Sequence, residues 1–161
     1  MRRLGCLALL LPALAFGVAC LPVSAALRPP ALSAARATEL VMAADSARAA
    51  AFAGADPSPL RPLFADAAIA PLLPELADLH RHQARIEERD SSRRLVHWAP
   101  LEGGGDGVLE VAGEERVVSG ADPGARWSRI VRQWFASLRW SGARWLVVDA
   151  RDLPPDQWWR S

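Results

Sequence analysis

The sequence predicts an α+β domain in which N-terminal helices pack on one face of a strongly curved, cone-shaped antiparallel sheet. Two observations favour this class. The first half of the chain carries apolar side chains at helical spacing and is rich in alanine, the best helix former. The second half changes to β-rich runs separated by turn residues. Helices that precede the strands, instead of alternating with them, are typical of α+β proteins.

Residues 1–25 predict a secretory signal peptide. Two arginines precede an apolar stretch, and small residues follow it. The uninterrupted apolar run is shorter than the ~20 residues that a membrane-spanning helix needs. Cleavage after Ala25 would release a secreted protein. Alternatively, residues 1–19 form a lipoprotein signal, and Cys20 becomes the lipidated N-terminus that attaches the protein to the membrane.

Composition limits the remaining options. The chain has 161 residues, enough for one domain after processing, and its formal net charge of +1 argues against a strongly basic nucleic-acid surface. Cys6 is removed with either signal, and Cys20 is either lipidated or removed. We therefore expect a mature domain without a disulfide, held together by its core alone, although its compartment would permit a disulfide.

The mature chain is expected to begin with a short tether, residues 26–31, which is rich in proline and alanine. Residues 32–155 then form the α+β domain. Residues 156–161 are a C-terminal tail that contains two tryptophans, Trp158 and Trp159. We expect these two rings to close over the helices or to offer an apolar contact to a partner.

Three helices are expected. Residues 32–53 form a long one with Arg36, Glu39 and Asp45 mostly outside its apolar stripe, Arg48 at the edge of the stripe, and Gly54 as its end. Two shorter helices follow, at residues 59–65 and 74–83, both next to prolines that fit a first helical turn. Around the third helix, four leucines are expected to point inward: Leu72, Leu73, Leu76 and Leu79.

The middle of the chain is expected to form short strands, at residues 84–88, 93–101, 108–111 and 116–118. Gly113 marks a bend between the last two. Residues 103–107 include four glycines and predict a loop. These glycines do not follow a strand and open a helix, so we reject a phosphate-binding loop.

Residues 126–151 predict the antiparallel hairpin around which the domain is organised. A Ser141-Gly142 turn separates two β-rich runs. On the first run Arg132 interrupts an otherwise apolar face, which consists of Ile130, Trp134, Ala136, Leu138 and Trp140. On the second run Trp145 and Val147 alternate with Leu146 and Val148. Trp134 and Trp145 are therefore expected to be buried.

Two motifs frame the domain. The first helix ends in Ala51-Phe52-Ala53-Gly54-Ala55-Asp56, and the hairpin reads Trp134-x-x-x-Leu138-x-x-x-Gly142-x-x-Trp145-x-Val147. With the order of helices and strands, this resembles the nuclear-transport-factor-2-like superfamily, in particular its exported actinobacterial members. The resemblance implies a bent sheet wrapped on a long helix, with a pocket inside the cone. The superfamily includes cyclases, dehydratases, isomerases, transport factors and assembly modules, so the fold does not determine function.

The hairpin supplies four candidates for lining the pocket: Arg132, Trp134, Trp145 and Asp149. Asp149 alternates with Trp145 along the strand, so it could enter the cone and act as a general base. Alternatively, it pairs with Arg144 or Arg151 at the rim. Arg132 could bind an anion inside the cone, but we favour an ion pair with Glu110 or Asp149, because a buried arginine needs compensation.

The three histidines do not predict a metal site. His80 and His82 are two residues apart, which turns their side chains about 200° from each other on a helix. His97 precedes Trp98 on a strand and so faces the opposite side of the sheet. If Trp98 faces the inside of the cone, His97 lies outside. No catalytic motif of the superfamily matches here, so no catalytic residue, metal ligand or cofactor is expected.

The sequence thus favours an exported or lipid-anchored, non-catalytic binding or accessory module at the cell envelope. Its expected partner is an envelope protein or a small apolar ligand, and not a nucleic acid. The main alternative is a small enzyme of the cyclase, dehydratase or isomerase type that uses Asp149 or a histidine in the pocket. A third alternative is a structural domain that forms a homodimer through its open sheet face.

Overall fold

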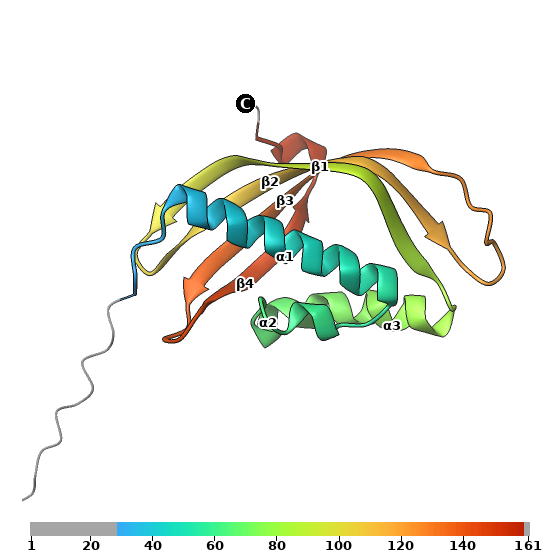
Figure 1. The fold of residues 1–161 in the computed structure, drawn as a ribbon, viewed down its shortest axis with the longest axis horizontal. Coiled ribbons are helices and arrows are strands. Elements are labelled where there is room, and N and C mark those ends of the chain that lie inside the picture. Colours follow the sequence, from blue (N-terminus) through green and yellow to red (C-terminus); the bar gives the residue numbers. More distant parts are fainter. Residues whose placement is uncertain (1–28, 160–161) are drawn as a thin grey trace, which may run out of the picture.

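In the computed structural model, which describes residues 29–159, helices precede a single antiparallel sheet, as predicted (Figure 1). Over these residues the elements are α1 (Ala34–Gly54), α2 (Asp66–Ile69), α3 (Leu73–Arg81), β1 (Arg85–Leu101), β2 (Gly104–Val118), β3 (Ser128–Trp140) and β4 (Trp145–Leu153). The strand order is β1-β2-β3-β4. The expected signal peptide, Cys20 and the start of the tether lie outside the described residues.

The sheet is strongly curved and arches over the helices (Figure 1). Helix α1 lies along its concave side, and α2 and α3 lie beyond α1. The described part of the C-terminal tail, residues 155–159, lies on the opposite, convex side. This arrangement confirms the predicted α+β cone. Within the described residues, no helix combines the length and the apolar character needed to cross a membrane.

Helix α1 starts and ends at recognisable caps. The Ser33 hydroxyl accepts a hydrogen bond from the backbone N–H of Arg36 at the N-terminus. At the C-terminus Ala55 adopts a left-handed conformation (φ 49°), so the helix ends at Gly54, one residue later than expected. Its buried stripe includes three alanines seven residues apart, Ala37, Ala44 and Ala51. These small side chains allow the helix to lie close to the sheet.

The shorter helices differ in part from the prediction. Residues 58–60 form only a 3-10 turn, and the unpredicted α2 follows it. Helix α3 was predicted, and Leu76 is buried with Leu72 and Leu79 packed against the core. Leu73 is 43% exposed, so its predicted inward position is wrong. Its place in the first turn of α3 puts it on the side that faces away from the core.

The loop before α2 also covers one edge of the sheet. Phe64 forms a parallel bridge with Val147 in β4. The N–H of Val147 donates to the carbonyl of Leu63, and the N–H of Ala65 donates to the carbonyl of Val147, each at 2.8 Å. These bonds satisfy backbone groups that an edge strand would otherwise expose.

Strands β1 and β2 are longer than predicted. The separate strands expected at residues 84–88 and 93–101 are the two halves of β1, which is continuous but irregular between Arg89 and Ser92. The strands expected at residues 108–111 and 116–118 are likewise parts of β2. Gly113 lies opposite the irregularity in β1, where a Cβ would come within 2.9 Å of the Cα of Ser91. Bulges of this kind bend a strand without ending it.

The prediction of a loop at residues 103–107 is wrong, except at Gly103, because residues 104–107 belong to β2. Gly103 has a φ of 71° and makes the turn, whereas β2 begins at Gly104. Glycine occurs here because the sheet is crowded and not because the chain must be flexible. The Trp98 ring lies where a Cβ on Gly105 would project, and Val41 of α1 lies 3.4 Å from the corresponding position on Gly107.

This crowding leads to a stability prediction. Replacing Gly105 with alanine should lower the free energy of unfolding by about 1–3 kcal/mol, because the new methyl group must displace the Trp98 ring. The matched control is Gly124→Ala, where nothing lies within 4 Å of the added carbon. Urea denaturation of both variants tests the prediction. Equal midpoints for the two variants would show that the Trp98 ring moves aside without cost.

The hairpin of β3 and β4 is confirmed. Trp140 pairs with Trp145 across the turn, and the N–H of Ser141 donates to the carbonyl of Arg144 at 2.9 Å. Trp134 is buried as predicted, with 1% of its surface exposed. Trp145 is only half-buried, because it lies next to the turn at the end of the hairpin, edge-on to Trp140 at 5.4 Å between ring centroids.

The C-terminal tail packs on the convex face of the sheet and not over the helices. The Trp159 ring stacks on His97, with 3.7 Å between the ring centroids. The side chain of Gln133 donates to the carbonyl of Trp159 at 2.8 Å and accepts from its N–H at 2.6 Å. The indole N–H of Trp158 donates to the carbonyl of Leu153. These contacts bury Gln133 on the outer face.

Candidate functional site

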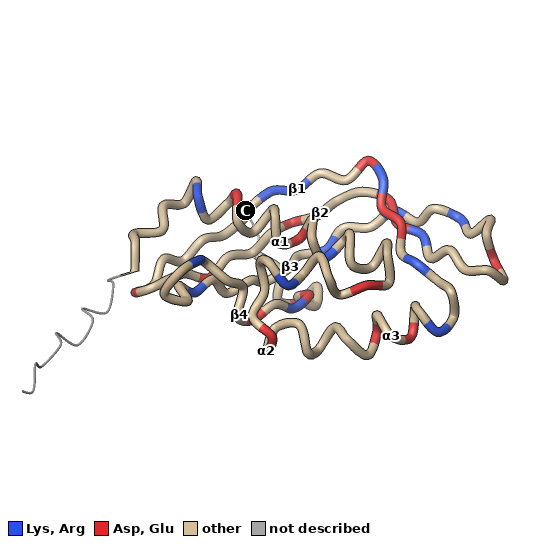
Figure 2. Tube along the Cα trace, turned by 60° about the horizontal axis from the view of Figure 1, so that its bottom comes forward, with Lys and Arg blue, Asp and Glu red and all other residues tan. Residues whose placement is uncertain are grey.

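A cavity of ≈ 520 Å³ opens on the concave side of the sheet, between the second half of α1, the start of α3 and the strands. Part of its wall is apolar, formed by Ala49, Phe52, Ile86, Ile130 and Val131. The rest of the wall is charged, formed by Arg48, Glu75, Glu88, Glu115, Arg129, Arg132 and Asp152. Acidic and basic residues lie close together along β1, which contributes Ile86 and Glu88 to the cavity (Figure 2).

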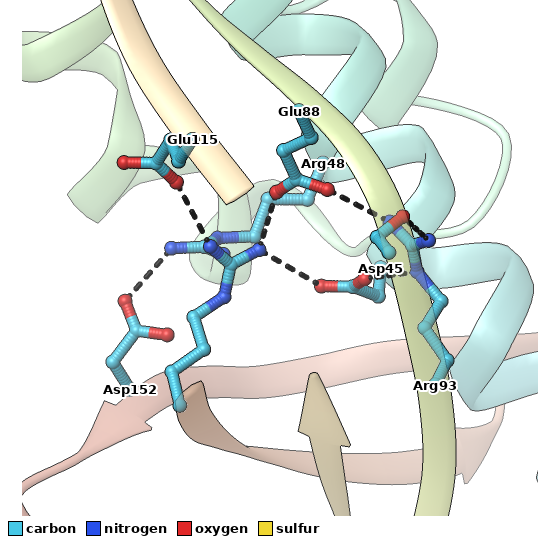
Figure 3. Close-up of polar contacts among 8 residues, drawn as sticks. Asp45, Arg48, Glu88, Arg93, Glu115 and Asp152 are labelled. Atoms are coloured by element: carbon cyan, nitrogen blue, oxygen red, sulfur yellow. Dashed lines mark hydrogen bonds and ion pairs between the residues drawn. The ribbon is translucent and has the colours of Figure 1, made fainter. Parts of the chain in front are cut away.

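An ion-pair network adjoins the cavity, which three of its members, Glu88, Glu115 and Arg132, help to line (Figure 3). Asp45 of α1 has no exposed surface, and its Oδ2 accepts a 2.6 Å hydrogen bond from Nε of Arg93. Glu88 bridges the two arginines, accepting from Arg93 at 3.0 Å and from Arg132 at 2.7 Å. Arg132 also donates to Glu115 at 3.2 Å, and its Nη2 lies 3.7 Å from Oδ1 of Asp45. The network therefore links α1 to β1, β2 and β3.

A separate ion pair lies beside this network (Figure 3). Nη2 of Arg48 donates to Oδ2 of Asp152 at 2.8 Å. The Arg48 side chain is mostly buried, and its guanidinium lies 5.3 Å from the centre of the Phe52 ring. The Asp152 side chain is 51% exposed, so this carboxylate remains accessible from the cavity mouth.

Arg132 is held in its charged form. Burial lowers its pKa, but the hydrogen bond to Glu88 and the charges of Glu88, Asp45 and Asp152 outweigh that effect and raise the pKa above its usual value. Arg132 Nε and Asp45 Oδ1 are buried and have no hydrogen-bond partner among the described residues. Each charge of the network faces an opposite charge, but these two buried atoms lack a hydrogen bond.

The structure places the four predicted pocket residues in different environments. Arg132 lies on the inner face and lines the cavity. Trp134 belongs to the core, and Trp145 lies at the far end of the hairpin. Arg132 forms ion pairs, as expected, but its partners are Glu88 and Glu115 and not the predicted Glu110 or Asp149. Glu110 lies on the outer face, where it pairs with Arg94 at 3.1 Å.

Asp149 does not enter the cone. Ser137 pairs with Asp149, but the next residue of β3, Leu138, pairs with Val147, so Val148 is an extra residue in β4. A one-residue bulge reverses the side to which the following side chains point. Asp149 therefore lies on the outer face, where it pairs with Arg151 at 3.2 Å. Asp152 instead takes an inward position opposite Trp134 and lines the cavity.

The histidines lie away from the cavity. His80 is exposed on α3, and His82 contacts Asp78 at the exposed end of the same helix. His97 lies on the outer face against Trp159, while Trp98 packs on the core, as their alternation predicts. Across residues 29–159, no group of three or more potential metal ligands could hold an ion.

Four members of the network were not anticipated: Asp45, Glu88, Arg93 and Glu115. Asp45 was expected to lie mostly outside the apolar stripe of α1. It is nevertheless four residues after Val41 and next to Ala44, both buried. An acidic residue at such a position signals a buried ion pair, since burial of an unpaired carboxylate is costly. The sequence does not show which arginine compensates it.

No protein-family model and no curated protein matches the chain. Among solved structures, the chain is similar to the intermembrane space region of the chloroplast protein ARC6, with 11% identity and a TM-score of 0.67. That match covers 77% of this chain and 98% of the other. The chain is also similar to an NTF2-like protein of unknown function from Shewanella baltica OS155, with 12% identity, a TM-score of 0.47, and coverage of 76% and 98%.

These similarities concern the fold. A long helix, further short helices and a bent four-stranded antiparallel sheet form the α+β cone that the sequence predicted. Because this fold serves unrelated functions, function has to be argued from the cavity and its side chains.

Proposed function

We propose that this protein is a non-catalytic binding or accessory module that receives a small apolar ligand or a segment of a partner protein at the open end of its cone. The observation that carries the proposal is the mutual pairing of most charged groups in the cavity. Glu88 and Glu115 bind Arg132, and Asp152 binds Arg48. Catalysis by general acid or base requires a positioned group that is available to exchange a proton with the substrate.

The same cavity meets the requirements for ligand binding, which are less demanding than those for catalysis. An apolar wall with a few polar groups is sufficient to bury and orient a ligand. Phe52, Ile86 and Ile130 provide that wall, and the ion pairs keep α1 and the strands in a defined arrangement around it. The placement of Asp149 and the histidines away from the cavity further favours binding over the enzyme alternative.

A ligand screen monitored by methyl NMR tests the proposal. Small apolar compounds that bind should shift the methyl resonances of Ile86 and Ile130 and leave Leu101, which does not line the cavity, unchanged. The compounds should be recovered chemically unaltered. If a compound is instead converted with turnover, and Glu88→Gln abolishes that turnover, the enzyme alternative is correct.

The cell-envelope location is part of the proposal and rests on residues 1–25. Mass spectrometry of the protein from its own cells should detect a chain that begins at lipidated Cys20 or near Ala26. Globomycin treatment distinguishes the two outcomes, since it blocks processing of lipoproteins only. Recovery of a chain that still begins with Met1 would contradict export.

The homodimer alternative concerns the convex face of the sheet. The tail already occupies the part of that face around His97 and Gln133, through the stack and the paired hydrogen bonds of Trp159. A dimer through this surface would have to displace the tail or avoid it. This contact favours the concave cavity as the place where a partner binds.

A further inference from the structure

One stretch of β3 has an open edge. β3 spans Ser128–Trp140, but its pairing with β4 ends at Gln133 opposite Leu153, after which Pro154 terminates the strand. In the described chain, residues 128–132 pair with β2 on one side and with no strand on the other. The cavity opens along this edge, since residues 129–132 and Asp152 line it.

The backbone groups that face the open side can be assigned from the alternation along the strand. The N–H of Trp140 donates to the carbonyl of Gly103, toward β2, whereas the N–H of Ser141 donates toward β4. In an antiparallel strand successive residues direct their N–H and C=O groups to opposite sides. The N–H and C=O groups of Arg129 and Val131 therefore point to the open edge, where they can bind another strand.

The other free edges of the sheet are less suited to binding an additional strand. The free side of β4 is bonded to the loop before α2 at Val147. The free side of β1 is interrupted by two register shifts, between Arg89 and Ser92 and between Leu95 and His97. Bulges protect an edge because they break the regular spacing of its backbone groups. Over residues 128–132, by contrast, the register of β3 with β2 is uninterrupted.

We propose that an extended segment of a partner protein adds as a strand to residues 128–132 of β3 and inserts a basic side chain into the cavity. This inference rests on the proposed binding function and specifies the partner. Strand addition supplies main-chain hydrogen bonds, and every second side chain of the segment then points to the concave side.

Charge complementarity selects a basic side chain. Inside the cavity Arg48 and Arg132 are both engaged in ion pairs. Glu75 is exposed and has no ion pair among the described residues, and Asp152, although paired with Arg48, is half-exposed. Arg129 also lines the cavity, but strand alternation directs its side chain to the other face of β3, so its charge does not offset that of Glu75 inside the cone. The accessible charge on the concave side is therefore negative, and the apolar wall suits the aliphatic stem of lysine or arginine.

The test starts from random octapeptides displayed on phage and selected on the purified protein. Selected peptides are expected to carry a lysine or arginine flanked by β-branched or aromatic residues at alternate positions. The tightest is synthesised and its dissociation constant measured by calorimetry. Val131→Pro should weaken binding by about tenfold or more, because it removes an edge donor. The control Val131→Thr keeps that donor and should bind as the original protein does.

Two measurements do not depend on the folding of the proline variant. N-methylation of single peptide amides should abolish binding at every second position only, which is the signature of strand pairing. Glu75→Gln should weaken binding by about two- to fivefold and remove the preference for a basic residue. Glu39 is also exposed but lies on α1 outside the cavity, so Glu39→Gln should have no effect.

Specific outcomes overturn the inference. Selected peptides that bind equally to Val131→Pro, and without alternating sensitivity to N-methylation, would show binding without strand addition. Enrichment of acidic peptides, or of none, would contradict the expected chemistry. Self-association that Val131→Pro abolishes would identify a second copy of the chain as the occupant. In each case the NMR screen still decides separately whether the cavity binds small ligands.

Discussion

Replacement of Trp134 with alanine should lower the free energy of unfolding by about 3–5 kcal/mol, the range for large-to-small changes in a core. Trp134 is 1% exposed and lies in β3 between Leu109 of β2 and Asp152 of β4. Its ring centroid is 6.3 Å from that of Phe64, so it also joins the sheet to the helical layer. The variant would leave a cavity at the junction of these elements.

The measurement is chemical denaturation followed by circular dichroism, with Trp159→Ala as the matched control. Trp159 is 49% exposed, so its removal should cost much less than that of Trp134. A loss of 3–5 kcal/mol is a large part of the roughly 5–15 kcal/mol that stabilises a typical domain. A Trp134→Ala protein with the denaturation midpoint of the original would contradict the core assignment.

Replacement of Asp45 with alanine should have an effect of similar size, about 3–5 kcal/mol, because it removes one partner from a buried ion cluster. Arg93 and Arg132 would then share Glu88 as their nearest common anion. Both guanidiniums would remain largely buried, and α1 would lose one of its charged links to the sheet, while the Arg48–Asp152 pair would remain. Asp45→Asn should cost less, since the amide oxygen can still accept a hydrogen bond from Arg93.

The control for Asp45 is Glu39→Ala on the same helix. Glu39 pairs with Arg36 at 2.6 Å, but both side chains are more than half exposed, so the expected loss is below about 1 kcal/mol. Denaturation of the two variants side by side therefore compares a buried with an exposed ion pair in one helix. Similar losses for Asp45→Ala and Glu39→Ala would mean that the buried network contributes little to stability.

The largest elements were predictable because their signals are local. The apolar spacing of α1 and the turn between Trp140 and Trp145 each involve residues close in sequence. The extent of β2 was not predictable in the same way. Considered without the rest of the fold, its glycines suggest a loop. Only the position of the Trp98 ring shows that they belong to a strand.

The candidate site was predicted only in part, for a related reason. Arg132 interrupts an apolar stripe, and this local pattern correctly indicated a paired arginine on the inner face. Its partners Glu88 and Asp45 are 44 and 87 positions away (132 − 88 and 132 − 45), on different elements. Charged residues are frequent in this chain, and local spacing does not distinguish which of them meet in the fold.

Asp149 and Asp152 show most directly what the sequence determined and what the tertiary structure decided. The sequence by itself determined that β4 alternates between two faces and that a carboxylate near its end could point inward. The bulge at Val148 decided which carboxylate does so, because one extra residue exchanges the faces of all that follow. That bulge depends on how β4 pairs with β3, a contact between strands, and so only the tertiary structure could place Asp152 in the cavity.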